Sequence, residues 1–289
     1  MAKLRRSCGT MAAHMLLLER YPAYRGRLAA LELATERLRT RRPSPRKQRI
    51  ITINCIVHVV WYVAAQNIGK SQIDSQFTVL NRDFRARNTD KSKVPTPWKG
   101  LVADSLLRFK CVQITRTKTT QRAFTVDDGV KRAASGGRAP ITPRSHLNIW
   151  VCPLSGGLLG YAQFPGGPAA TDGVVINYQA FGTRGTAQAP FNKGRTTTHE
   201  IGHYFNLRHI WADTPDCSGS DLVADTPNCA GPNYGKPRWP SLSCRNGPHG
   251  DMFMNYMDYV DDDAMFMFTP GQSLRIRAAL AGPRAGLTR

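Results

Sequence analysis

Glutamate is scarce in this sequence of 289 residues, which contains four. Glu19, Glu32 and Glu36 lie near the N-terminus, and Glu200 is the only glutamate that follows them. The rest of the chain uses aspartate for its acidic groups, which places the carboxylate one methylene closer to the backbone. The lone late glutamate therefore marks a position where the longer side chain is needed.

Long hydrophobic runs are also absent. No apolar stretch approaches the roughly 20 residues that a membrane-spanning helix needs, so no such helix is expected. The stretch 11–18, MAAHMLLL, is short for the apolar part of a secretion signal, and no small-residue cleavage site follows it, so no signal peptide is predicted. Hydrophobic residues make up 41% and charged residues 21%, which predicts a globular chain of one large domain or two subdomains.

Acidic residues are few relative to basic ones: the chain has 40 Lys and Arg but 20 Asp and Glu, which gives a net charge of +20. Such an excess would normally indicate a nucleic acid or an anionic surface as partner. Residues 1–50 hold 13 Lys and Arg against three Glu, whereas the residues after 200 hold eight Lys and Arg against nine Asp. The excess lies at the front and no DNA- or RNA-binding motif is visible, so nucleic acid is not an expected partner.

Cysteines are few and odd in number, seven in all. Three lie within 28 residues near the C-terminus, a spacing that fits a local disulfide: Cys217, Cys229 and Cys244. Three others lie in apolar stretches and are expected to be buried thiols: Cys55, Cys111 and Cys152.

Helical and extended segments can be assigned from periodicity. Residues 11–39 carry apolar side chains at helical spacing and are predicted to form one helix. Residues 41–49, RRPSPRKQR, contain two prolines and five positive charges, which predicts a linker open to trypsin-like cleavage. Residues 50–63 are rich in β-branched side chains and predict a core strand, and 71–85 predict an amphipathic helix packed on it.

Further strand candidates are separated by Gly and Pro and span 107–117, 146–154, 158–165 and 172–181. After residue 210 little periodicity remains until a short helix near 270–281. This order of elements predicts an α/β (α+β) fold with a mixed sheet and a loop-rich C-terminal part. That part would need a disulfide or a metal ion to hold its shape.

The segment 198–211, THEIGHYFNLRHIW, carries candidate chemistry. His199 and His203 are four residues apart, so on a helix they lie on one face, where both can ligate one zinc ion. Glu200 can reach the open metal position and take a proton from a zinc-bound water. Given this composition, an H-E-x-x-H match is expected about 0.002 times by chance. A surface helix with stray histidines is therefore a poor explanation.

A third histidine extends the motif. His209 follows His199 by ten residues, which completes the metzincin pattern H-E-x-x-H-x-x-G-x-x-H, except that Asn206 stands at the glycine. In that pattern the glycine adopts a left-handed conformation that turns the chain back toward the metal. Asn is the residue other than glycine that best tolerates this conformation, so the turn is expected to form.

The segments HEIGHYFNLRHIW, VADTPN and NYMDYVDDDAMFMFTPGQ resemble the pappalysin family of metzincin metalloproteases. Upstream, LNRDFRARNTDKSKVP, LNIWVC and GGLLGYAQFPGG are similar to the same family. The likeness implies a metzincin catalytic domain at 50–289, with a twisted mixed sheet and an active-site helix at 50–209 and a loop-rich subdomain at 210–289. Residues 1–49 then become a basic helical segment and a candidate propeptide.

The resemblance also implies a zinc endopeptidase that acts on peptides or proteins and is secreted. A monomer is expected. By position, the zinc ligands would be His199, His203 and His209, and Glu200 would be the general base. Met257 would lie beneath the metal, and Tyr259 matches a family tyrosine whose hydroxyl can bind the oxyanion, with a packed aromatic as the alternative.

SDLVADTPN, 220–228, resembles the family's calcium-binding loop, with a solvated acidic turn as the alternative. Its candidate ligands are Asp221, the carbonyl of Val223, Asp225 and Thr226. Cys217 and Cys244 match the family's disulfide pair, which closes the loop around this segment. Cys229 lacks an obvious partner, because Lys236 stands where another cysteine would be expected.

An acidic cluster follows the turn methionine, where metzincins build the pocket for the residue after the cleaved bond: Asp258, Asp261, Asp262 and Asp263. We expect Asp263 to pair there with a long cationic side chain, which predicts a preference for Arg or Lys. Solvent-facing aspartates are the alternative. Substrate is expected to bind by strand addition along an edge strand in 156–167.

The stretch 5–10, RRSCGT, resembles the cysteine switch of latent proenzymes, in which a thiolate takes the fourth position on zinc. Arg5 and Arg6 are expected to favour ionisation of Cys8, and cleavage in 41–49 would release it. The alternative is an exposed cysteine without such a role.

Two other interpretations of the whole chain stay open. One is a basic non-catalytic binding protein that keeps zinc only as a structural staple, although a structural site would have a fourth protein ligand. The other is a misassembled or truncated gene product, because the stretch between Phe109 and Ile114 looks shorter than in the family and would weaken the fold.

Overall fold

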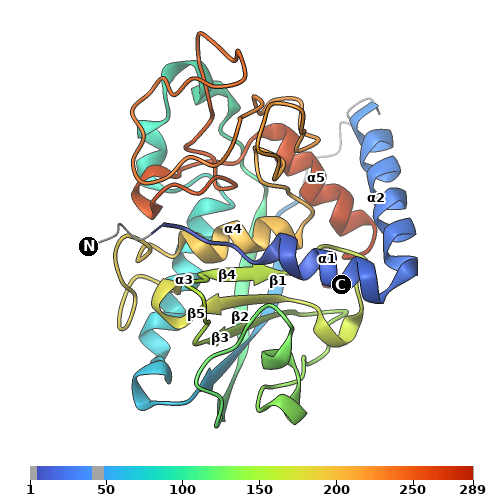
Figure 1. Cartoon of the computed structure of the whole chain (residues 1–289), viewed down its shortest axis with the longest axis vertical. Helices are drawn as coiled ribbons and strands as arrows, with labels where there is room; N and C mark the ends of the chain where they lie inside the picture. Colours follow the sequence, from blue (N-terminus) through green and yellow to red (C-terminus); the bar gives the residue numbers. More distant parts are fainter. Residues whose placement is uncertain (1–4, 41–48, 289) are drawn as a thin grey trace.

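Five strands form one mixed sheet in the computed structural model, which describes residues 5–40 and 49–288 (Figure 1). The strand order is β2-β1-β3-β5-β4; the first four run parallel, and β4 runs antiparallel to β5 at one edge. The predicted α/β fold with a mixed sheet is therefore confirmed. The strands are β1 (Ile51–Trp61), β2 (Leu107–Lys118), β3 (Leu147–Cys152), β4 (Gly160–Ala162) and β5 (Val174–Asn177).

The predicted core strand forms β1, which lies between β2 and β3. Its inward positions are β-branched or small, as a pleated and buried surface favours, and Ile53, Val57 and Val59 are fully buried in the larger core. Val60 faces the opposite side of the sheet, in a second cluster with Trp150. The sheet is thus buried on both faces, as sheets of parallel strands usually are.

β2 runs without interruption through the stretch that was expected to be shortened. Cys55 of β1 pairs with Cys111 and Ile56 pairs with Gln113, so Val112 is an extra residue at a register shift. A shift of this kind bends a strand but keeps it paired. The expectation of a lost strand connection between residues 109 and 114 is therefore wrong.

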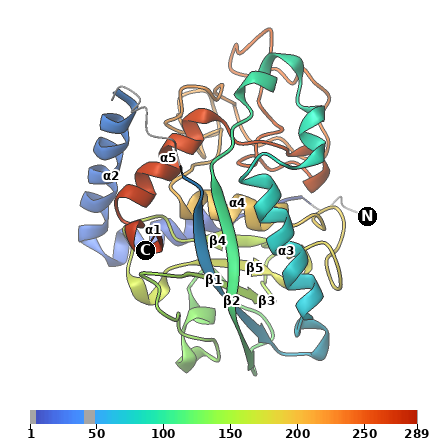
Figure 2. The same ribbon diagram turned by 180° about the vertical axis from the view of Figure 1, so that it is seen from behind.

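Two of the helices that pack against the larger core lie on the sheet. α3 (Lys70–Asp83) lies against β2, and α4 (Arg195–Tyr204) lies against β4 and β5; both contribute buried side chains to the same cluster. Figure 2 shows α3 from the side where it lies nearest the viewer. The amphipathic helix predicted at 71–85 corresponds to α3. α4 carries the histidine motif, so the sheet and α3 hold that helix in place.

The N-terminal segment contains two helices where one was predicted, α1 (Thr10–Arg20) and α2 (Pro22–Thr40). The break lies at Tyr21, which leaves the helical region with φ −130° and ψ 85°. Pro22 explains it, because proline lacks a backbone N–H and disfavours the helical conformation in the residue before it. α1 lies beside β4, and α2 lies beside α5 (Pro270–Ala281) in both views (Figures 1 and 2).

The predicted linker 41–49 falls, except for its last residue, outside the described residues. In the described ranges 5–40 and 49–288 no helix is long and apolar enough to cross a bilayer. Short 3₁₀ helices occupy several connections: η1 (Ala64–Gln66), η2 (Thr89–Lys93), η3 (Thr96–Leu101), η4 (Gly129–Lys131), η5 (Ala133–Ser135), η6 (Ala169–Thr171), η7 (Tyr178–Ala180), η8 (Asp262–Ala264) and η9 (Ala285–Thr288).

Residues 210–269 form the predicted loop-rich part, drawn in orange above α4 in Figure 1. They contain isolated bridges but no extended strand. α5 follows, close to the expected 270–281, and begins at a capping box between Thr269 and Gln272 with Pro270 in the first turn. The loops are therefore anchored at one end by a well-capped helix.

Candidate active site

Helix α4 presents two of the three motif histidines. It begins after Gly194, which has a left-handed φ of 73°, and all of its residues are buried. The chain leaves the helix after Tyr204, and Asn206 also adopts φ 73°. This is the left-handed conformation predicted for the glycine position of the motif, and it brings His209 back toward the helix.

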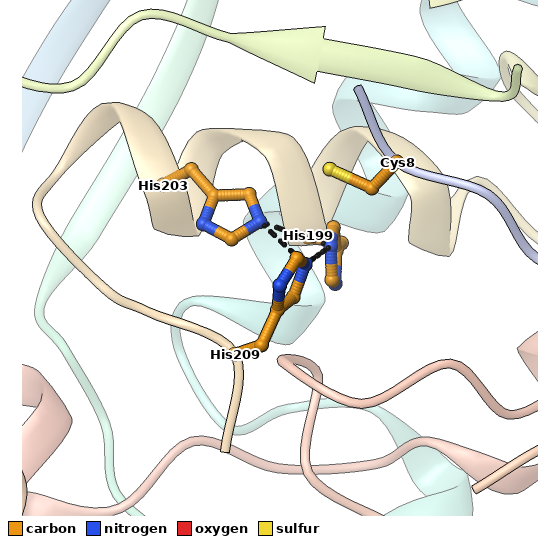
Figure 3. A group of neighbouring side chains, drawn as sticks. All are labelled: Cys8, His199, His203 and His209. Atoms are coloured by element: carbon orange, nitrogen blue, oxygen red, sulfur yellow. Dashed lines mark hydrogen bonds between the residues drawn. The ribbon is translucent and has the colours of Figure 1, made fainter. Parts of the chain in front are cut away.

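The three imidazole rings converge on one point (Figure 3). The Nε2 atom of His203 lies 3.1 Å from that of His199 and 3.1 Å from that of His209, and the third separation is 3.2 Å. All three side chains are buried. With Cys8 they form the only group of three or more His, Cys, Asp or Glu side chains arranged to hold a metal ion in the part of the chain that the structure describes.

The outer nitrogen of each ring lies within hydrogen-bond distance of an oxygen. Nδ1 of His199 donates to the carbonyl of Tyr256 at 2.7 Å, and Nδ1 of His203 donates to that of Leu207 at 2.7 Å. Nδ1 of His209 lies 2.6 Å from a carboxylate oxygen of Asp213. Backbone carbonyls only accept, so the first two rings present an unprotonated Nε2 to the centre.

This donor set fits a zinc ion. Burial, followed by the neighbouring histidines, holds the pKa of His199 and of His203 well below the ordinary value, which keeps both rings neutral. Converging lone pairs repel one another unless a cation lies between them. Zinc–nitrogen bonds of about 2.0–2.1 Å in a tetrahedron place ligand nitrogens about 3.3 Å apart, close to the spacing observed here.

Met257 lies beneath the histidines, in van der Waals contact with α4. It is fully buried, and a Cβ atom added at Gly202 would lie 2.4 Å from its sulfur. Its carbonyl accepts from the backbone N–H of Ile210, just after His209. The glycine inside the motif is therefore the residue that lets the methionine approach the helix between its two histidines.

Glu200 is buried beside the histidines and faces the N-terminal segment. Its Oε2 accepts from the Thr10 hydroxyl at 2.9 Å and lies 3.5 Å from the Cys8 sulfur. Burial raises the pKa of Glu200 to about 7, against the lowering effects of Thr10, Cys8 and Arg6. The carboxyl is thus poised between its protonated and ionised forms near neutral pH.

The N-terminal segment lies along the edge strand β4. The backbone N–H of Gly9 donates to the Gly160 carbonyl at 2.9 Å, and that of Leu159 donates to the Ser7 carbonyl at 3.0 Å, which makes a parallel bridge between Cys8 and Gly160. The edge where strand addition of substrate was predicted is therefore covered by the chain's own residues (Figure 1).

Cys8 lies over the histidine cluster, with its sulfur within 4.8 Å of the candidate ligand atoms (Figure 3). Burial, followed by the charge of Glu200, raises the pKa of its thiol well above the usual value. Arg5 and Arg6 contact other groups, so the expectation that they favour the thiolate is wrong. Hydrogen bonds from Thr10 favour ionisation but do not offset the burial, and a bound cation would favour it further.

Arg6 enters a buried pocket beside the site. Its guanidinium forms an ion pair with Asp262 at 2.6 Å, donates to the Thr196 hydroxyl at 3.0 Å and to the Val260 carbonyl at 3.1 Å, and covers the ring of Phe191. A buried cation is stabilised only when its charge and its N–H groups are satisfied in this way. The pocket is therefore complementary to a guanidinium.

Asp263, predicted to be the pocket base, lies elsewhere. Its carboxylate is 35% exposed and pairs with Lys193 and Lys236 at the surface. Asp262 is fully buried and also accepts from the backbone N–H of Lys193 at 2.7 Å. Asp262, and not Asp263, therefore lies at the base of the pocket that Arg6 enters, because neighbouring side chains at the start of η8 point in different directions.

Tyr259 lies over His209 at 4.9 Å between ring centroids, and its hydroxyl is 3.5 Å from the Cys8 carbonyl. Burial, followed by the neighbouring Cys8 and Glu200, raises the pKa of this phenol. The hydroxyl therefore remains a donor at neutral pH and points at a carbonyl next to the histidine cluster.

The candidate calcium loop holds itself together through hydrogen bonds. Asp221 accepts from the Val223 backbone and the Thr226 hydroxyl, and Asp225 caps α5 by accepting from the Thr269 hydroxyl and the Gly271 backbone. Three of the candidate ligands, Asp221, Val223 and Thr226, are therefore linked to one another, and Asp225 connects the loop to α5.

Cysteine pairing follows the resemblance. Cys217 and Cys244 form a disulfide, and Cys229 is free and buried. Cys55 and Cys152 are buried as predicted, whereas Cys111 is half-buried because β2 is the outer strand of the sheet.

Comparison with known proteins bears on the identity of this site. Residues 145–281 match the peptidase M43 family model, described as pregnancy-associated plasma protein-A. An extracellular metalloprotease of Arthroderma benhamiae is 32% identical over 243 residues, covering 82% of this chain and 80% of that protein. The chain belongs to the pappalysin family. An extracellular metalloprotease of Pyricularia oryzae is 33% identical over 257 residues, covering 83% of this pappalysin and 78% of its relative.

Solved structures agree. Promirolysin of Tannerella forsythia, in a mutant form, is 39% identical and superposes with a TM-score of 0.88 over 98% of this pappalysin and 97% of that chain. Mature mirolysin of the same organism, in complex with a cleaved peptide, is 44% identical with a TM-score of 0.81 over 84% and 97%. The chain is therefore a metalloendopeptidase with a metzincin fold, and the interpretation as a non-catalytic binding protein is wrong.

Several residues of this site escape sequence reasoning. Thr10, Arg6 and Asp262 are brought to it by contacts between distant segments, which no local pattern reveals, whereas Asp213 lies four residues after His209. Gly202 is the exception, because a glycine inside a helix costs about 1 kcal/mol relative to alanine and so signals a close approach.

Proposed function

We propose that this pappalysin is a zinc-dependent endopeptidase in which Glu200 is the general base. The observation that carries the proposal is the convergence of three Nε2 atoms beside the single buried glutamate of the motif. His199, His203 and His209 would hold the metal. Zinc, when bound, would supply a Lewis acid that polarises the peptide carbonyl and acidifies a water molecule.

Three residues of the chain have distinct roles in this mechanism. Glu200, with a pKa near neutrality, takes a proton from the attacking water and passes it to the leaving amine. Tyr259 donates its hydroxyl proton in a hydrogen bond to the developing oxyanion, where it now faces the Cys8 carbonyl. Met257 packs against Gly202 of α4 and so positions the helix that carries His199 and His203.

The test is proteolysis of an unstructured substrate such as casein after removal of residues 1–49. Glu200→Gln is expected to lower kcat by about 100-fold or more, since general-base catalysis contributes roughly 10²–10⁴. A zinc chelator should abolish activity and added zinc should restore it. Asp74→Asn, an exposed carboxylate of α3 that remains after the removal, serves as control. Activity that survives both the chelator and Glu200→Gln would exclude this mechanism.

A preference for a basic residue after the cleaved bond is part of the proposal, now assigned to Asp262 in place of Asp263. The guanidinium of Arg6 in the Asp262 pocket supports it, because the segment that carries Arg6 passes directly over the histidines. Profiling with a peptide library is the measurement, and a uniformly apolar preference would contradict the proposal.

Residues 1–49 are proposed as a propeptide that keeps the enzyme latent through Cys8. Residues 50–289 make up about 83% of the chain, close to the 84% that matches mature mirolysin, whereas promirolysin matches 98%. The pairing of the segment with β4 adds support, because a substrate would need the same edge. Calcium in the 220–228 loop, secretion and a monomeric state stay predictions; metal content, culture-medium fractionation and sedimentation would test them.

A further inference from the structure

A second subsite lies beside the Asp262 pocket. The segment 233–235 runs alongside 258–261, which forms the wall of that pocket: Gly235 bridges to Val260, and the backbone N–H of Asp261 donates to the Gly235 carbonyl at 2.8 Å. The Val260 carbonyl in turn accepts from Arg6. The two segments therefore form one continuous surface next to the pocket.

Tyr234 stands on that surface in a fixed position. The preceding residue, Asn233, donates from its backbone and its side chain to the buried Asp258 at 2.9 and 3.0 Å, so the backbone is held on both sides of the tyrosine. The ring of Tyr234 lies 6.0 Å from that of Tyr259 and remains 37% exposed. The ring of Tyr234 is thus held in place and exposed beside the Asp262 pocket.

Arg5 contacts the exposed ring of Tyr234. Its guanidinium carbon lies 4.9 Å from the centroid of the Tyr234 ring, within the range of a cation–π interaction.

The order of the contacts defines the order of subsites. Moving away from the histidines, the segment places Cys8 over the cluster, Arg6 in the pocket and Arg5 on Tyr234. The segment pairs parallel to β4, so a substrate whose residues after the cleaved bond occupy these positions runs antiparallel to β4. Its first residue after the bond then enters the pocket, and its second meets Tyr234.

We propose that Tyr234 is a specificity-determining residue that selects a cationic side chain, preferably Arg, two residues after the cleaved bond. The preferred substrates of this enzyme are then peptides with two adjacent basic residues following that bond. The inference rests on the proposed function, because it takes the Arg6 pocket as the site for the first of those residues.

The test uses four peptides that carry Arg or Ala independently at the first and second positions after the cleaved bond. The enzyme is the full chain after limited tryptic cleavage in 41–49, with the trypsin then blocked by a serine-protease inhibitor. Arg at the second position is expected to raise kcat/KM about two- to fivefold over Ala, the effect of one exposed cation–π contact. Tyr234→Leu should remove this gain, and Tyr234→Phe should keep most of it.

Tyr62→Leu, an exposed tyrosine at the end of β1, is the matched control and should leave the gain unchanged. Asp262→Asn should reduce the effect of the first position without changing the effect of the second. Equal rates for Arg and Ala at the second position, or a gain that persists in Tyr234→Leu, would overturn the inference while leaving the protease activity intact. Cleavage of none of the peptides would refute the proposed function and this inference with it.

Discussion

At the scale of single residues, the site depends on how closely two backbone segments approach. Gly202 lies between the two histidines of α4, and the Met257 sulfur occupies the space where a side chain would begin. A glycine in a helix lowers stability by about 1 kcal/mol relative to alanine, so its presence here reflects the contact and not the helix. Met257 and α4 can therefore pack closely only because residue 202 is a glycine.

Gly202→Ala is therefore expected to destabilise the protein by about 1–3 kcal/mol, because overpacking outweighs the gain in helix propensity. Zinc affinity should fall with it, since Met257 must move under the histidines. Urea unfolding and zinc titration measure the two effects. Gly26→Ala in α2 is the control: no atom lies within 4 Å of its added Cβ, so it should stabilise the protein by up to about 1 kcal/mol. A Gly202→Ala protein as stable as wild type would contradict the argument.

His58 is a buried histidine outside the site. It lies in β1, with Nε2 2.8 Å from the Asn148 side-chain oxygen and Nδ1 2.7 Å from the Thr115 hydroxyl. Burial lowers its pKa to about 4, helped by the charge of Arg138. The folded state thus binds a proton at His58 less readily than the unfolded state does. The contribution of this group to the free energy of unfolding is fully present above pH 6.5 and is lost as the pH falls through 4.

The fall of this pKa from 6.5 to about 4 corresponds to about 3 kcal/mol. We expect His58→Gln to remove that part of the acid sensitivity, so wild type should lose about 3 kcal/mol more than the variant between pH 7 and pH 4. Urea midpoints at several pH values give the comparison. Parallel stability curves for the two proteins would show that His58 does not carry this proton linkage.

At the scale of elements, Glu32 ties α2 to α5 and to the turn that follows α4. Glu32 binds Arg275 of α5 through both oxygens, at 2.7 and 2.8 Å, and accepts from the Asn206 side chain at 3.1 Å. Arg275 also donates to the Asn206 carbonyl. The asparagine that replaces glycine in the motif therefore gives the N-terminal segment a contact point at the turn before His209.

Glu32→Ala leaves the buried Arg275 without its carboxylate partner. We expect this loss to weaken the docking of α2 on α5 by about 1–3 kcal/mol. Hydrogen exchange of the α2 backbone should accelerate accordingly. Glu36→Ala is the control, because its ion pair with Arg39 is fully exposed and should contribute little to stability. Equal exchange rates in the two variants would mean that Glu32 does not anchor the helix.

At the scale of the whole molecule, residues 5–40 cover three features of the catalytic domain: the edge of β4, the Asp262 pocket and α5 (Figure 1). In the proposed latent form, Cys8 makes one contact among several, so latency should not rest on the thiol alone. The strand pairing and the Arg6 ion pair would also oppose entry of a substrate, because they occupy the edge of β4 and the proposed pocket.

Cys8→Ala in the full chain is therefore expected to show only partial activity, above that of the intact wild type and below that of the chain without residues 1–49. The measurement is peptide cleavage by the three proteins at equal zinc content. Full activity of Cys8→Ala would assign latency to the thiol alone, and no gain over wild type would exclude the thiol as a cause of latency.

What the sequence determined by itself is local. The i, i+4 spacing of His199 and His203, the left-handed turn at Asn206 and the return of His209 all follow from backbone geometry within about ten residues. The alternation of β-branched residues in 50–63 likewise defined a core strand, because a pleated surface repeats every two residues. Such features need no knowledge of what packs against them.

Only the tertiary structure decided which distant groups complete the site. Arg6 meets Asp262 across 256 positions and Thr10 meets Glu200 across 190, and no periodicity relates such pairs. The choice of Asp262 over Asp263 depends on the direction of two neighbouring side chains, which is set by what each packs against. Side-chain partners far apart in the chain are selected by packing and desolvation of the folded whole, and for that reason the pocket and the covering segment could be located only in three dimensions.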